Sequence, residues 1–116
     1  MTLKNLTSSA VQLLKDLIEI PSFSSEEHLT AARIEAWFTS YNIPFQRSQN
    51  NIWATNADFD ASKPTLLLNS HHDTVKPNNG YTKDPFKAQV IDGKLFGLGS
   101  NDAGGCLVAL MATFTH

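Results

Sequence analysis

Two short polar stretches contain the residues best suited to chemistry. His71, His72 and Asp73 directly follow an apolar run at 66–68, and Asp102 lies further along in a glycine-rich stretch. Imidazole nitrogens and carboxylate oxygens are common protein ligands of zinc and related divalent metals. A carboxylate can also bridge two such ions, roughly 3.5–4 Å apart, in a hydrolytic site. The residue types therefore favour a metal-dependent hydrolase if the fold brings the two stretches together.

The spacing in the first stretch predicts different roles for its side chains. "TLLLNS" is a short apolar run, as expected of a strand buried on both faces, and sites often form where such strands end. Since side chains alternate along an extended chain, His71 and Asp73 should point one way and His72 the other. His71 then offers one ring nitrogen to a metal while Asp73 accepts the other ring N–H. The alternative is a solvated polar loop, because an isolated His-x-Asp pattern is short.

The second stretch, "FGLGSNDAGG", is expected to turn tightly and deliver Asp102 to the site. Gly97-x-Gly99-x-x-Asp102 superficially resembles a dinucleotide-binding fingerprint, but the third glycine is replaced by an aspartate. That carboxylate would stand where the pyrophosphate binds, so the nucleotide interpretation is rejected. The alternative role for Asp102 is an N-cap of the apolar helix that follows.

Two helices are predicted before these stretches. "SSAVQLLKDLIEIP" has helical apolar spacing, with Thr7 or Ser8 as its cap and Pro21 after its end. "SSEEHLTAARIEAWFTSYNIP" is the second, where Ser24 and Glu27 have the spacing of a capping box.

Hairpins and a last helix complete the expected order. "PFQRSQ" and "IWATN" flank Asn50–Asn51 and suggest a hairpin or a pair of short strands. Alternating residues flank Asp92–Gly93, which is a strong hairpin signal. From about Asp102 onward the apolar residues regain helical spacing. Helices mixed with strands argue for an α/β fold.

Composition excludes several classes of protein. The chain has 116 residues, a net charge of −2 and one cysteine. It has no basic footprint for nucleic acid or anionic membranes, and no apolar run long enough to cross a bilayer. The single Cys106 cannot form an internal disulfide and suits a reducing cytoplasm, and it is expected to be a small buried residue. Trp53 is expected to pack, although a strand tryptophan can also face a substrate.

"SHHDTV" and "GLGSND" resemble the two N-terminal signature motifs of the M20 metallopeptidase family of di-zinc aminoacylases, deacylases and peptidases. The resemblance extends over the whole chain, including "LLKDLIEIPSFSSEE" and "DPFKAQVIDGKLFGLGS", and within the family it is closest to the acetylornithine deacetylase branch. It implies a three-layer sheet-and-helix catalytic domain of the zinc-peptidase type. Residues 1–116 would be the N-terminal portion of that domain, without its remainder and without the dimerisation domain.

The resemblance also implies the roles of individual residues. His71 would bind one of two zinc ions, with cobalt or manganese as possible substitutes, and Asp102 would bridge both ions. Asp73, the only residue assigned to catalysis, would orient the His71 imidazole, while His72 would have no metal role. The Asp102–Ala103 peptide bond would be cis, as is frequent in the family.

Two departures from the family pattern limit what this chain can do. Gly104 stands where members commonly carry a lysine, and the glutamate pair that supplies the general base has no counterpart. Glu26–Glu27 is the only such pair, and it lies in a predicted helix cap before the first motif. We therefore expect this piece to be inactive alone and weak in binding zinc.

The full-length protein would then hydrolyse the amide of an N-acyl amino acid, N-acetylornithine first, as a homodimer acting on a small molecule. A dipeptidase, an aminopeptidase or an N-succinyl amino acid desuccinylase would share the same motifs. A non-catalytic α/β binding module is the alternative from another class. Residues that bind the substrate cannot be assigned from the sequence.

Overall fold

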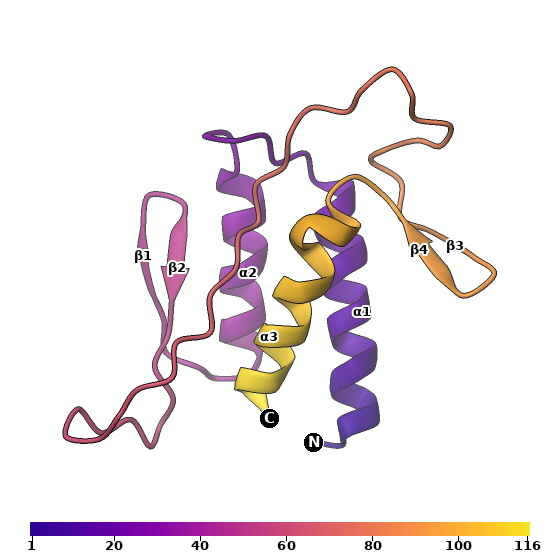
Figure 1. Ribbon diagram of the computed structural model, residues 1–116. Coiled ribbons are helices and arrows are strands. Elements are labelled where there is room, and N and C mark those ends of the chain that lie inside the picture. The colour runs from indigo at the N-terminus through magenta and orange to yellow at the C-terminus, as the bar shows by residue number, and fades with distance from the viewer.

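The computed structural model describes all residues from Met1 to His116 and contains three α-helices and two β-hairpins (Figure 1). The first helix, α1, spans Leu3–Glu19. It begins earlier than predicted because Thr2 is the cap: its hydroxyl accepts a hydrogen bond from the Asn5 backbone N–H at 3.2 Å. The hydroxyls of Thr7 and Ser8, the predicted caps, instead donate to carbonyls one turn back within the helix.

The second helix, α2, spans His28–Ser40, and its N-cap residue is Glu27. No side chain caps this helix, so the predicted capping box is wrong. Ser24, its expected first member, donates its hydroxyl to Asp73. A contact between residues far apart in sequence has replaced the local one.

Both predicted hairpins form. Strands β1 (Gln46–Ser48) and β2 (Asn51–Trp53) pair antiparallel, as do β3 (Gln89–Ile91) and β4 (Lys94–Phe96). Asp92 and Gly93 have φ of 51° and 73°, as a tight hairpin turn of this type requires. In the first hairpin Ser48 pairs with Asn51, so the turn is Gln49–Asn50, and Gln49 has positive φ, at 55°.

The predicted strand after β2 does not form: no residue of 65–70 belongs to a strand. This segment runs unpaired alongside the last helix (Figure 1). Leu66 and Leu67 are 83% and 80% exposed. A strand requires a partner backbone, and the structure offers none here. The chain is therefore α/β with two short two-stranded sheets, and it lacks the central sheet that three layers would need.

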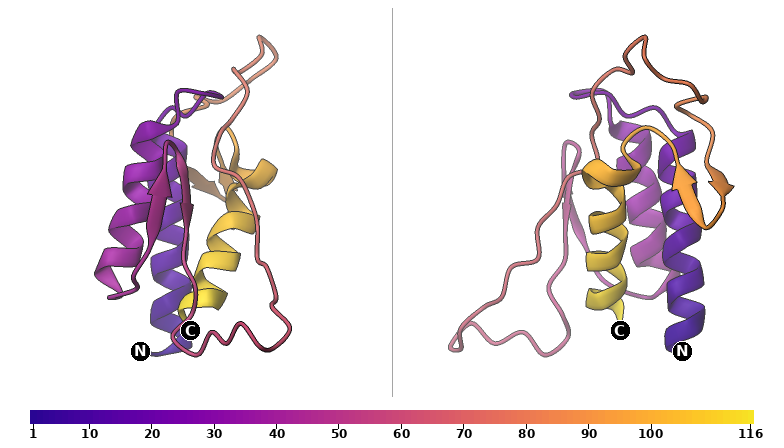
Figure 2. Two further views of the ribbon diagram at one scale, coloured as in Figure 1. Left: turned by 90° about the vertical axis from the view of Figure 1, so that its left-hand side faces the viewer. Right: turned by 45° about the vertical axis from the view of Figure 1, so that its right-hand side comes forward.

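The third helix, α3 (Gly105–Thr115), packs with α1 and α2 to form the core. The views in Figure 2 show the three helices side by side, with the connection after β2 swinging out from them. Trp37 Nε1 donates to Thr115 Oγ1 at 3.0 Å, which ties α2 to α3. None of these helices has the length and apolar character needed to cross a membrane. The buried cluster consists of Leu6, Ala10, Leu13, Leu17, Ile34, Trp37, Phe38, Val108 and Met111.

Candidate metal centre

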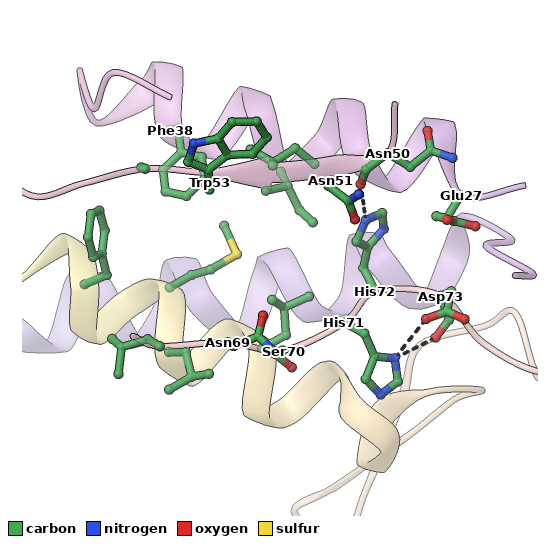
Figure 3. A pocket seen from close by; sticks show the side chains of 18 of the residues that line it. Glu27, Phe38, Asn50, Asn51, Trp53, Asn69, Ser70, His71, His72 and Asp73 are labelled. Carbon is green, nitrogen blue, oxygen red and sulfur yellow. Dashed lines mark hydrogen bonds and ion pairs between the residues drawn. The ribbon is translucent and has the colours of Figure 1, made fainter. Parts of the chain in front are cut away.

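The two polar stretches meet in space. His71 Nδ1 lies 3.0 Å from Asp73 Oδ1, and His71 Nε2 lies 3.1 Å from Asp102 Oδ1. Figure 3 shows the ring of His71 turned toward Asp73, while His72 points to the opposite side of the segment. The predicted alternation of side chains is therefore correct, and the imidazole of His71 lies between two carboxylates.

The hydrogen-bond partners constrain the protonation of His71. A carboxylate only accepts, so Asp73 is matched by a proton on Nδ1, which leaves Nε2 as a bare acceptor in the neutral ring. Nε2 then faces a second acceptor, the carboxylate of Asp102, at 3.1 Å. Two acceptors at this distance need either a proton or a cation between them. In the imidazolium form of His71, a proton on Nε2 lies between them.

The pKa values follow from these contacts. Partial burial acts to lower the pKa of His71, but hydrogen bonds to the Asp73 carbonyl, the Asp102 carboxylate and the Asp73 carboxylate outweigh it and raise the pKa. The hydrogen bond from Ser24 is the main cause of a lowered pKa at Asp73, and His71 adds to the effect. Asp73 thus stays ionised, as an acceptor for a histidine N–H must be.

Asp102 reaches the site through a tight turn between β4 and α3. Gly99 has φ of 78°, which favours glycine, and residues Ser100–Gly104 form a short wide helical turn in which Asp102 and Ala103 are not helical. The Asp102–Ala103 peptide bond is cis, as expected. The Asp102 side chain is 89% exposed, and the N-cap of α3 is Gly104 without any side-chain cap. The helix-cap alternative for Asp102 is therefore excluded.

His72 is structural, a role that sequence reasoning missed. Its Nε2–H donates to the Asn50 carbonyl at 2.8 Å, and its Nδ1 lies 2.7 Å from the Thr30 hydroxyl. These contacts join the 70–74 segment to the β1–β2 turn and to α2. Only a polar, buried Thr30 in an otherwise apolar helix stripe could have indicated such a partner.

A pocket of about 430 Å³ extends from the His71 segment between β2 and α3. Trp53 lines this pocket and is 47% exposed, so it packs less than predicted. Glu27 also lines the pocket, and its Oε2 is buried without a hydrogen-bond partner. Cys106 is exposed, contrary to prediction, because the outer face of α3 is left uncovered.

The donor atoms present suit part of a metal site. Zinc bonds of about 2.0–2.2 Å at near-tetrahedral angles place two donors roughly 3.3 Å apart, close to the separation of His71 Nε2 and Asp102 Oδ1, 3.1 Å. No group of three or more histidine, cysteine or acidic side chains is arranged to hold a metal. The two donors His71 Nε2 and Asp102 Oδ1 fit a zinc ion but do not complete its coordination.

The sequence of this chain is similar to those of known proteins. Residues 67–116 match the model of Peptidase family M20/M25/M40. Succinyl-diaminopimelate desuccinylase of Xylella fastidiosa (strain 9a5c) is 35% identical over 111 residues, which cover 90% of this chain and 28% of the relative. The enzyme of that name from Rhodospirillum centenum is 29% identical over 88% of the chain and 28% of the relative. A probable succinyl-diaminopimelate desuccinylase of Staphylococcus aureus (strain Mu50) is 31% identical over 89% and 27%.

The chain spans little more than a quarter of the length of these relatives, 27–28%. All three have desuccinylase names, and these matches do not support the acetylornithine deacetylase branch in particular. At the level of the family, these matches agree with the resemblance of "SHHDTV" and "GLGSND" to M20 motifs.

Proposed function

We propose that this chain, a homologue of the hydrolases of Peptidase family M20/M25/M40, supplies part of the metal centre of an enzyme that cleaves the amide bond of an N-acyl amino acid. The observation that carries the proposal is the His71 imidazole held between two carboxylates, at 3.0 and 3.1 Å. One carboxylate would orient the ring, and the other would be a metal ligand beside it. The activity belongs to a longer protein, because the relatives are several times longer than the chain.

In this proposal His71 and Asp102 would hold metal, and Asp102 would be shared by two ions, zinc by preference and cobalt or manganese as substitutes. Asp73 keeps the Nδ1 proton in place, so that Nε2 presents its lone pair to the metal. When bound, a divalent ion would supply Lewis-acid chemistry, with a polarised amide carbonyl and a more acidic water. No residue of this chain matches the glutamate general base, which we expect in the rest of the protein together with the remaining ligands.

The substrate we favour is an N-succinyl amino acid, because the relatives described above are desuccinylases. N-acetylornithine, suggested by the resemblance of the motifs, is the second substrate to be tested. The protein would act on a small molecule and form a homodimer through a separate domain. The three-layer catalytic domain would be completed by strands outside these residues, beside the unpaired 65–70 segment.

Asp102→Ala in the full-length protein tests the metal role. Zinc affinity is measured by calorimetry, and hydrolysis is followed with N-succinyl-diaminopimelate, N-acetylornithine and dipeptides. Loss of a bridging ligand should weaken zinc binding by more than about 100-fold and abolish turnover. Asp58→Ala, an exposed aspartate in the loop after β2, is the control and should change neither quantity.

The substrate panel separates the remaining candidates. Cleavage of the succinyl substrate supports the desuccinylase, and exclusive cleavage of N-acetylornithine or of dipeptides would assign another branch. A protein that binds no zinc stoichiometrically and hydrolyses none of these amides would be a binding module, and the proposal would be wrong.

A further inference from the structure

A short segment between α1 and α2 is joined to the metal-binding stretch. Thr74 N–H donates to the Ser22 carbonyl at 2.7 Å, and Ser24 N–H donates to the Thr74 carbonyl at 3.2 Å. The Ser22 hydroxyl adds a bond to the His72 carbonyl at 3.0 Å. Phe23 and Thr74 form a parallel β-bridge between the two segments. The backbone of Ser24 is thereby fixed against the segment that carries His71 and Asp73.

The Ser24 side chain makes a different kind of contact. Its hydroxyl donates to Asp73 Oδ2 at 2.5 Å, while Asp73 Oδ1 faces His71 Nδ1 at 3.0 Å. Each oxygen of one carboxylate therefore has its own partner. A bond from a hydroxyl to an ionised carboxylate is among the stronger hydrogen bonds in proteins.

The bond from Ser24 to Asp73 matters because the carboxylate of an aspartate rotates easily about its last torsion. With Oδ2 bound to Ser24, this rotation is arrested and Oδ1 stays aligned with His71. Without that bond the carboxylate is held only by the ring that it is supposed to orient. Two carboxylates then compete for one proton of the neutral imidazole, Asp73 at Nδ1 and Asp102 at Nε2.

We propose that Ser24 is a positioning residue of the metal centre: its hydroxyl fixes the Asp73 carboxylate, which keeps the His71 proton on Nδ1 and leaves Nε2 free for metal. This inference rests on the proposed function, in which His71 is a metal ligand. The only side-chain hydrogen bond of Ser24 goes to Asp73, so Ser24 would act through that carboxylate.

The first test uses the full-length protein without metal and needs no activity. Long-range ¹H–¹⁵N NMR correlations, recorded at a pH where His71 is neutral, report which ring nitrogen holds the proton. The chain with Ser24 should hold it on Nδ1. In Ser24→Ala the ratio of Nδ1–H to Nε2–H should fall about tenfold, the effect expected for one hydrogen bond to a charged group.

Two further variants separate positioning from simple support of the fold. Ser24→Thr keeps the hydroxyl and should restore the tautomer. Ser22→Ala removes a hydrogen bond from the same segment without touching Asp73, so the tautomer should not change. An unchanged His71 tautomer in Ser24→Ala, or an equal change in Ser22→Ala, would overturn the proposal.

Zinc binding by the full-length protein is the second readout. Loss of a residue that orients a ligand typically costs 10–100-fold in metal affinity, and Ser24→Ala should lie near the lower end, about tenfold. If the tautomer shifts but neither protein binds zinc, the positioning role holds and the proposed metal function fails. If zinc binds equally to both while the tautomer stays on Nδ1, Ser24 has no such role.

Discussion

Gly99→Ala tests whether the turn before α3 is shaped by the segment that carries His71. Gly99 has φ of 78°, and a Cβ atom there would lie 2.6 Å from Thr74 Cγ2. Backbone hydrogen bonds to Ser22 and Ser24 hold the Thr74 backbone in place, so the clash can be relieved only by rotation of the Thr74 side chain or by a shift of the turn. Either change costs free energy at the contact between the two stretches that carry Asp102 and His71.

The free-energy cost of Gly99→Ala has two parts. A left-handed conformation costs a residue with a Cβ about 1–2 kcal/mol. Overpacking against a fixed neighbour adds about 1–3 kcal/mol. Gly93→Ala is the matched control, because its φ is 73° but nothing lies within 4 Å of the added Cβ. Gly99→Ala should therefore destabilise the fold by about 1–3 kcal/mol more than Gly93→Ala.

Urea denaturation followed by circular dichroism measures both free energies of unfolding. Thr74→Ser removes only the clashing methyl group, so in the Gly99→Ala background it should recover most of the excess cost. This double-mutant cycle isolates the contact between the two positions. Equal costs for the two glycine variants, or no recovery on Thr74→Ser, would refute the argument that the turn packs against Thr74.

The other predictions concern the core and the histidine. Leu13→Ala, at a side chain with 0% exposure, should lower the free energy of unfolding by about 2–5 kcal/mol, whereas Val11→Ala, 43% exposed on the same helix, should cost under about 1 kcal/mol in the same urea titration. NMR titration of the metal-free chain should place the pKa of His71 above its ordinary value of 6.5, the unfolded-state reference. Because the folded pKa is the higher one, the stabilisation is complete below about 6.5 and is lost as pH rises through the folded pKa. Asp73→Asn should remove part of this upward shift, and a His71 pKa at or below 6.5 in the unsubstituted chain would contradict the prediction.

Local features of the sequence determined most of the elements. Apolar spacing indicated α1, α2 and α3, and the Asp92–Gly93 pair indicated the β3–β4 hairpin with its turn. These features depend on interactions within a few residues, which is why they can be read from one short window. The separate directions of His71 and His72 follow from the same local geometry.

Predictions that depended on distant partners were less successful. Ser24 has the sequence of a helix cap but bonds to Asp73, 49 positions away, because the chain path offers its hydroxyl a charged acceptor. The 65–70 run has the composition of a buried strand, yet it stays unpaired without a neighbouring backbone. Cys106 is exposed because nothing in these residues covers its side of α3.

The candidate site, too, was indicated in part by the sequence and in part only by the tertiary structure. Residue types and the family resemblance, both properties of the sequence alone, were enough to single out His71, Asp73 and Asp102. Only the tertiary structure brought Asp102 Oδ1 to 3.1 Å from His71 Nε2, a contact across 31 positions. The Gly99 turn before Asp102 lies close against Thr74, and such packing between separate segments has no local signature in the sequence.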